Sequence, residues 1–133
     1  MVYDEFSEWL DDQLCKDLPQ EVVAFNFNLY EGLSDSSECP VKQYHIELIG
    51  ADCFDEDDED WPCNEVFTTR DNLFIVERTK DIMGWKKGLG FVTSLVTKYL
   101  QEGKYAGKLK SAVAVGIGFV DGDITILYHR EED

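Results

Sequence analysis

A run of acidic residues is the feature of this sequence with the clearest capacity for chemistry. Between Asp52 and Asp60 (D-C-F-D-E-D-D-E-D) seven of nine residues are carboxylates, none is basic, and Trp61 follows directly. Such a density of like charge is unfavourable by itself, so solvation, a bound cation or a basic partner must offset the repulsion. Clustered carboxylate oxygens are ligands for hard cations, and they also attract proteins rich in Lys and Arg.

A calcium-binding loop of the EF-hand type does not fit this run. That loop needs a glycine near its middle and a glutamate at its end. Counted from Asp55, those positions hold Asp60 and Val66. A cation site of another kind stays open, as does a solvated acidic loop that binds nothing.

A docking surface for a basic protein is the interpretation that Trp61 favours. Tryptophan is enriched among the residues that dominate binding energy at interfaces, and acidic residues around an aromatic anchor suit a basic target. Trp61 is equally compatible with a place in the core, where Pro62 would fix its turn. The predicted partner-binding residues are the seven carboxylates and the tryptophan: Asp52, Asp55, Glu56, Asp57, Asp58, Glu59, Asp60 and Trp61. No metal ligand, cofactor or catalytic residue is assigned.

Residues that could support catalysis carry no recognisable signature. His45 and His129 are the only histidines, and no spacing pairs them with one of the four cysteines, Cys15, Cys39, Cys53 and Cys63. His45 and Glu47 would share one face of a strand and could form an acid–base pair, but an exposed strand face explains them equally well. The segment G-W-K-K-G-L-G (84–90) lacks the spacing of a phosphate-binding loop, and its lysines suit a solvated helix face. We therefore expect a protein that is not an enzyme.

The acidic charge is concentrated in the first half of the chain. Residues 1–65 hold 19 Asp and Glu against two bases, a net of −17, whereas residues 66–133 hold nine acids and ten bases, a net of +1. A surface this negative repels nucleic acid and anionic membranes, and it attracts cations and basic proteins. Neither nucleic acid nor a membrane is expected as a partner.

The length of 133 residues suits one domain with a single core, and 44% hydrophobic residues argue against disorder. The N-terminal segment M-V-Y-D-E-F-S-E-W lacks the features of a signal peptide, and no stretch approaches the roughly 18 apolar residues of a membrane span. We expect a cytoplasmic protein with reduced thiols. The oligomeric state is left open.

The pattern of apolar residues predicts an α+β fold. A helix is expected over 3–18, where Pro19 ends it, and strands over 21–31 and 41–49, where apolar and polar residues alternate. Residues 65–78 are expected to contain a third strand, best defined at Leu73 to Glu77, with a turn over 70–72 before it. A second helix over 81–101, ended by Gly103 and Gly107, and a hairpin over 111–128 complete the order α-β-β-β-α-β-β. This order predicts a mostly antiparallel sheet of about five strands, with two main helices on one face. The acidic run is then a loop that leaves a strand.

Two glycines interrupt the first strand of the predicted hairpin. Gly116 and Gly118 lie on the same face, which they leave without side chains. A helix packed closely on the sheet would explain them. A strand or loop of a partner that approaches this face is the alternative.

Several segments resemble immunity proteins of bacterial polymorphic-toxin systems. These are A-F-N-F-N-L-Y-E (24–31), I-E-L-I-G (46–50), the acidic run with its flanks (54–67) and A-V-G-I-G-F-V-D-G-D-I (114–124). The resemblance implies a bacterial cytosolic protein that binds a cognate toxin and blocks it without catalysis. Since nuclease toxins are basic where they grip nucleic acid, an acidic inhibitor can occupy that surface and exclude the substrate. Such a non-catalytic inhibitor is the function we expect; a cation-binding protein or another cytosolic interaction module is the alternative.

Overall fold

The computed structural model describes residues 2–33, 42–58, 60–79, 82, 84–120 and 122–130. Within these residues the elements are α1 (Val2–Leu14), β1 (Ala24–Leu33), β2 (Lys42–Ala51), the short 3-10 helix η1 (Trp61–Cys63), β3 (Glu65–Thr68), β4 (Phe74–Glu77), α2 (Trp85–Glu102), α3 (Ala106–Lys110), β5 (Ala114–Phe119) and β6 (Thr125–His129). The predicted α+β class is confirmed, and the element order is close to the one expected.

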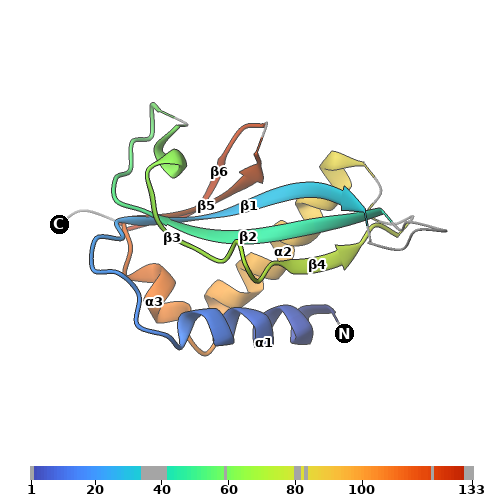
Figure 1. The fold of residues 1–133 in the computed structure, drawn as a ribbon, viewed down its shortest axis with the longest axis horizontal. Coiled ribbons are helices and arrows are strands. Elements are labelled where there is room, and N and C mark those ends of the chain that lie inside the picture. The colour runs from blue at the N-terminus through green and yellow to red at the C-terminus, as the bar shows by residue number, and fades with distance from the viewer. Residues whose placement is uncertain are drawn as a thin grey trace.

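One curved sheet forms the centre of the molecule, with strand order β3-β2-β1-β5-β6 and β4 paired to β2 beside β3 (Figure 1). Strands β1 and β2 pair antiparallel along their whole length, from Ala24↔Ala51 to Leu33↔Lys42. Strands β1 and β5 are parallel, and the chain returns to β5 from β4 through α2 and α3. All other pairings are antiparallel.

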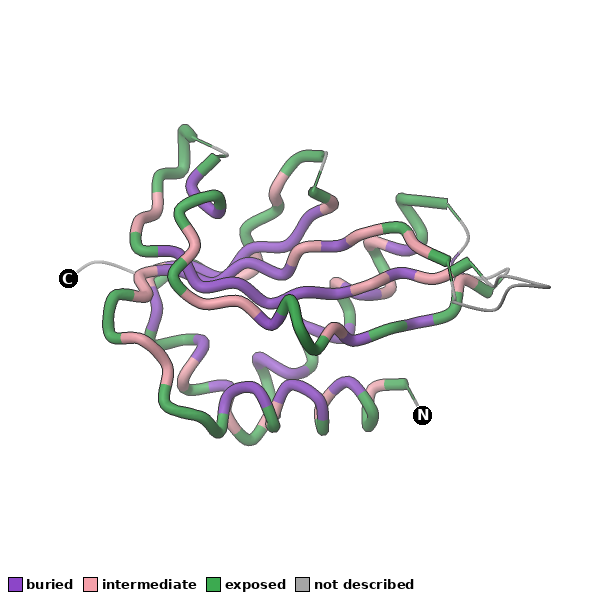
Figure 2. Tube along the Cα trace, in the orientation of Figure 1, coloured by how far each residue is buried: buried purple, intermediate pink, exposed green. Residues whose placement is uncertain are grey.

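The helices pack against the sheet and enclose the main core; α1, α3 and the end of α2 lie below the sheet in Figure 1, and the first turns of α2 appear above β1 at the right. Alternate residues of β1 and β2 point into this core, including Phe27, Leu29 and Tyr44, and they meet Phe6 of α1 and Tyr99 of α2. Figure 2 shows the buried residues along the strands and the inner sides of the helices. Within the described residues, no helix combines the length and the apolar character that a membrane crossing requires.

The opposite face of the sheet carries no helix comparable with α1 or α2, and two segments rise from it (Figure 1). One is the acidic loop, residues 52–64, which joins β2 to β3 and contains η1. The other is the β5–β6 hairpin, residues 114–129. These two segments form the walls of the cleft described below.

Some elements differ from the expected ones. The helix predicted over 3–18 ends at Leu14, where Lys108 Nζ donates to the carbonyls of Leu14 (2.5 Å) and Lys16 (3.3 Å) and so satisfies the free C-terminal end. The strand predicted at Leu73–Glu77 is β4, and the turn predicted before it is closed by a 2.8 Å bond from Asn72 N to Thr69 O, whereas the short strand β3 was not predicted. The helix α3 was not predicted either, and it contains Gly107, which was expected to end the second helix.

The close approach at Gly116 and Gly118 comes from the chain's own hairpin. A Cβ at Gly118 would collide with the backbone carbonyl of Asp123 on the returning segment. A Cβ at Gly116 would lie 2.6 Å from Asn26 Oδ1 and 2.9 Å from Ile124 Cγ2. The glycines therefore let the hairpin fold over the sheet, which neither the helix nor the partner explanation anticipated.

Candidate functional site

The acidic loop is anchored to the sheet by the side chain of Trp61. Trp61 is 2% exposed and packs edge-on against Phe54, with ring centroids 5.2 Å apart. Beneath the indole lie Ala24, Ala51 and Ala114, which are cross-strand neighbours in β1, β2 and β5. Because three alanines meet at this point of the sheet, their small side chains leave room for a large ring.

Local hydrogen bonds give the loop a defined shape. The side chain of Asp55 accepts a bond from the amide of Asp57, and that of Asp58 accepts one from the amide of Asp60, each at 2.9 Å. The two ends of the loop are joined by a 3.2 Å bond from the amide of Asp52 to the carbonyl of Asn64. Such Asx turns fix a polar loop without help from the core.

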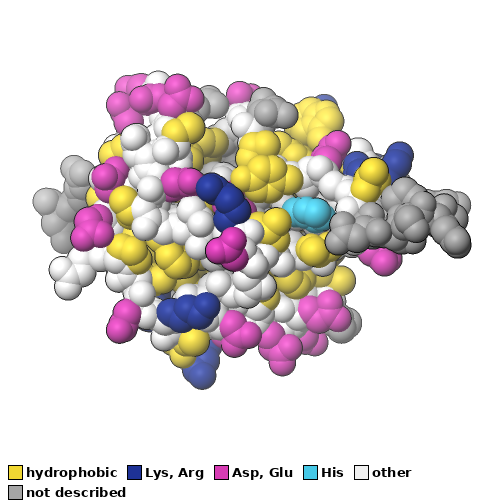
Figure 3. Space-filling view, in the orientation of Figure 1, with side chains coloured by type: hydrophobic (Ala, Val, Ile, Leu, Met, Phe, Trp, Pro, Cys, Tyr) yellow, Lys and Arg dark blue, Asp and Glu magenta, His cyan; other side chains and the backbone are white. Residues whose placement is uncertain are grey.

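The described carboxylates of the loop face solvent and have little internal charge compensation. All six are exposed: Asp52, Asp55, Glu56, Asp57, Asp58 and Asp60. Within the described residues only Glu56 contacts a basic side chain: its carboxylate lies 3.3 Å from His129 Nδ1, which makes an ion pair only when the histidine is protonated. Figure 3 shows acidic side chains gathered over the position of this loop, at the upper left. The predicted residue Glu59 lies outside the described residues.

The structure corrects the role predicted for Trp61. Its ring lies in the small cluster beneath the loop and cannot contact a partner while the loop is folded. The alternative place in the core is the observed one. The tryptophan holds the carboxylates in place and does not itself present a binding surface.

A cleft of about 540 Å³ separates the acidic loop from the β5–β6 hairpin. Asp60, Cys63 and Glu65 line its loop side, and Phe119 and Val120 belong to its hairpin side. Its remaining lining includes polar side chains of the open sheet face, namely Asn26, Asn28, Tyr30 and Arg70.

A hydrogen-bonded network centred on the buried carboxylate of Glu47 lies beneath this cleft. Glu47 Oε1 accepts bonds from Tyr30 Oη (2.6 Å) and Asn28 Nδ2 (3.1 Å), and Oε2 accepts one from Arg70 Nε (3.0 Å). Arg70 also donates to Glu65 Oε1 at 2.6 Å. Burial and the bond to Glu47 raise the pKa of Tyr30 to about 12, so the phenol keeps its proton and donates it.

This network satisfies Glu47 and so does not indicate a catalytic carboxylate. Three donors occupy its two oxygens, which is how proteins stabilise a buried charge. One polar atom at the bottom of the cleft is unsatisfied: Asn26 Oδ1 is buried and has no hydrogen-bond partner among the described residues. It lies against Gly116.

The histidines and cysteines do not form a reactive pair within the described residues. His45 Nε2 is 2.9 Å from Gln43 Oε1 and is not hydrogen-bonded to Glu47. His129 contacts Glu56 and the ring of Phe54. Cys53 accepts a bond from Asn64 Nδ2, and Cys39 lies outside the described residues. No group of three His, Cys, Asp or Glu side chains that could hold a metal ion occurs in the part of the chain that the structure describes.

The sequence analysis missed the cleft and its polar floor. The available signal was the alternation of Asn26, Asn28 and Tyr30 with apolar residues in the first strand. That alternation marks a polar sheet face. It does not reveal that Arg70, from a turn 40 residues further along, would cover the same face beside Glu47.

Comparison of this chain with protein-family models, curated proteins and solved structures gives no match.

Proposed function

We propose that this protein is a non-catalytic inhibitor that binds a basic protein through its acidic loop, as a cytoplasmic immunity protein that neutralises a bacterial toxin. The observation that carries the proposal is the set of exposed carboxylates on a loop held by a buried tryptophan. Of the six described, five have no ion pair within the described residues. Their repulsion is unrelieved inside the molecule, and a basic surface would relieve it.

The anchoring of the loop favours binding over simple solvation. A solvated surface loop that binds nothing does not need a fixed conformation. A loop that binds a partner gains affinity when its conformation is ordered before binding. Trp61, the Asx turns and the contact between Glu56 and His129 supply that order. A toxin that cleaves nucleic acid carries positive charge where phosphates bind, so such a toxin suits this surface.

The loop is expected to act mainly on the association rate. Complementary charges steer encounter and can raise association rates by about 10–10³-fold, an effect that falls with salt. Replacing Asp55, Asp57, Asp58 and Asp60 by Asn should therefore slow association with the partner and flatten its salt dependence.

A matched variant separates local charge from total charge. Exposed acids of α1, on the opposite face of the sheet, can be neutralised in equal number: Asp4→Asn, Glu5→Gln, Glu8→Gln and Asp12→Asn. This variant should associate nearly as fast as the wild type. Equal rates for the two variants would show that only net charge matters and would remove the loop from the proposal.

The partner for these measurements is obtained by capture from the native strain. The captured protein is then produced alone and tested for toxicity, with and without this protein. We expect a basic protein whose toxicity is relieved by the wild type. A captured partner that is acidic, or whose toxicity persists, would contradict the proposed function.

A further inference from the structure

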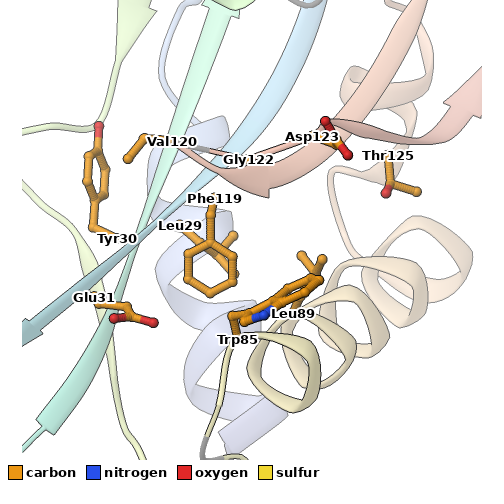
Figure 4. A pocket seen from close by; sticks show the side chains of 10 residues that line it. All are labelled: Leu29, Tyr30, Glu31, Trp85, Leu89, Phe119, Val120, Gly122, Asp123 and Thr125. Atoms are coloured by element: carbon orange, nitrogen blue, oxygen red, sulfur yellow. The ribbon is translucent and has the colours of Figure 1, made fainter.

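A second hollow, the Trp85 groove, lies where the sheet meets the start of α2. It has a volume of about 880 Å³, and its lining includes Leu29, Trp85, Leu89, Phe119, Val120 and Asp123. Figure 4 shows Trp85 and Leu89 on α2 facing Phe119 of β5, with Leu29 of β1 beside Phe119. Its centre is apolar, and acidic side chains lie toward its ends.

Trp85 is held in an exposed position by the residues around it. The hydroxyl of Tyr44 lies 2.9 Å from the carbonyl of Ile82 and 3.0 Å from that of Gly84. Gly84 has φ of 93°, a conformation suited to glycine, and its carbonyl accepts the amide of Gly88 in the first turn of α2. Trp85 thus begins the helix with 57% of its surface exposed, whereas Trp9 and Trp61 are 8% and 2% exposed.

The groove adjoins the acidic cleft. Tyr30, Phe119, Val120 and Gly122 line both hollows, so the tip of the β5–β6 hairpin is a wall common to the two. Val120 on this wall is 49% exposed. A partner that covers this tip can therefore contact both hollows.

The charges around the groove determine where a bound segment could carry positive charge. Glu31 and Asp123 line the groove. Glu31 is paired with Arg78 Nη1 at 3.6 Å, whereas Asp123 forms no ion pair within the described residues. Across the cleft stands the acidic loop. On the helix side, Lys86 Nζ already lies 5.6 Å from the centre of the Trp85 ring. Lys or Arg side chains of a bound segment are therefore favoured on the side of the cleft, near the acidic loop, and are repelled by Lys86 on the side of α2.

We infer that the groove receives an apolar side chain of the same basic partner, next to Lys or Arg residues that lie toward the cleft. This inference rests on the proposed function. It assigns to Trp85 the role of aromatic anchor that was predicted for Trp61. Exposed tryptophan beside other apolar side chains is the composition of an interface hot spot, surrounded here by a charged rim. The loop governs approach, and the groove governs dissociation.

Trp85 provides the assay, since it is the exposed member of the three tryptophans. A short capped peptide that joins lysines to leucines is titrated into the protein, and the quenching of tryptophan emission by acrylamide is measured. One comparison peptide has serines in place of the leucines, and another has glutamates in place of the lysines. We expect the first peptide to shift the emission to the blue and to protect it from acrylamide, and the other two to have little effect.

Two variants locate the binding event. Trp85→Phe should abolish the optical change. Val120→Lys retains Trp85 and alters an exposed side chain, so the fold should be unaffected, and it should weaken peptide binding by about tenfold or more. Protection by the glutamate peptide equal to that by the lysine peptide, absence of protection by the lysine–leucine peptide, or binding unaffected by Val120→Lys would each overturn the inference.

These results are distinguishable from failure of the proposed function. Loss of the loop's effect on partner association, with Trp85 still protected by the basic peptide, would contradict the steering role alone. An intact loop effect with no protection of Trp85 would contradict the groove alone.

Discussion

Replacing Trp61 by alanine tests whether this residue holds the acidic loop or forms an exposed anchor. An aromatic side chain of this kind buries about 150–250 Å², which at about 25 cal/mol/Å² corresponds to about 4–6 kcal/mol as an upper limit. The edge-on contact with Phe54 adds about 0.5–1.5 kcal/mol to this area contribution. Measured Trp→Ala substitutions in cores cost about 3–5 kcal/mol, which is the loss we expect for a ring that is 2% exposed.

Trp85→Ala is the matched control, because the same chemical change is made at a ring that is 57% exposed. Its cost should be about 1 kcal/mol or less. Both variants are unfolded in urea and followed by far-UV circular dichroism, since tryptophan emission itself changes with the substitution. With a slope near 1.5 kcal/mol/M, a loss of about 3 kcal/mol moves the midpoint by about 2 M.

A Trp61→Ala protein no less stable than Trp85→Ala would refute the anchoring argument. If that protein also bound the partner more weakly, Trp61 would be a surface contact after all. The expected pattern is a large loss of stability at Trp61 and, at Trp85, a loss of partner affinity with little loss of stability.

Two further predictions follow from the packing of β2 and its neighbours. Tyr30 should titrate with a pKa of about 12 in an absorbance titration. The free energy of unfolding should fall as the pH rises from about 10 to about 12, because the phenol of the unfolded chain loses its proton first. The substitution Glu47→Gln should lower the pKa of Tyr30 only in part, since burial is the largest cause of its shift. A Tyr30 pKa near 10 would contradict the network around Glu47. In thermal unfolding, Gly88→Ala should be destabilising because a Cβ there collides with the ring of Tyr44, whereas Gly90→Ala, which has open space in the same helix, should stabilise the protein by about 0.5–1 kcal/mol. Equal effects of the two substitutions would contradict the packing of Gly88 against Tyr44.

The main elements of the fold could be predicted because their signals are local. The stripe of Phe6, Trp9 and Leu10 marks an amphipathic helix, and strict alternation marks β1 and β2. The early end of α1 could not be predicted, because it depends on Lys108, which is 94 residues away from Leu14 in the sequence. Parallel pairing of β1 with β5 likewise depends on the whole crossover.

The acidic loop of the candidate site could also be predicted, because its signal is local. A dense acidic run is expected to be an exposed loop wherever it lies, and the structure confirms a loop after β2. Which tryptophan is exposed is not a local property. Trp61 is buried because three alanines from three strands meet beneath it, and Trp85 is exposed because Tyr44 fixes the start of α2. Neither arrangement can be derived from the residues adjacent to each tryptophan.

The β5–β6 hairpin links the two parts of the proposed interface. Its tip lines both the cleft and the Trp85 groove, and His129 near its end contacts Glu56 of the acidic loop. Gly116 and Gly118 bring this hairpin down onto the sheet, where its returning backbone packs against them. The bare strand face thus lets the hairpin tip lie between the acidic cleft and the groove that holds the exposed tryptophan. A partner that is drawn in by charge therefore arrives where an apolar side chain can be buried, so fast capture and slow release come from adjacent but distinct residues.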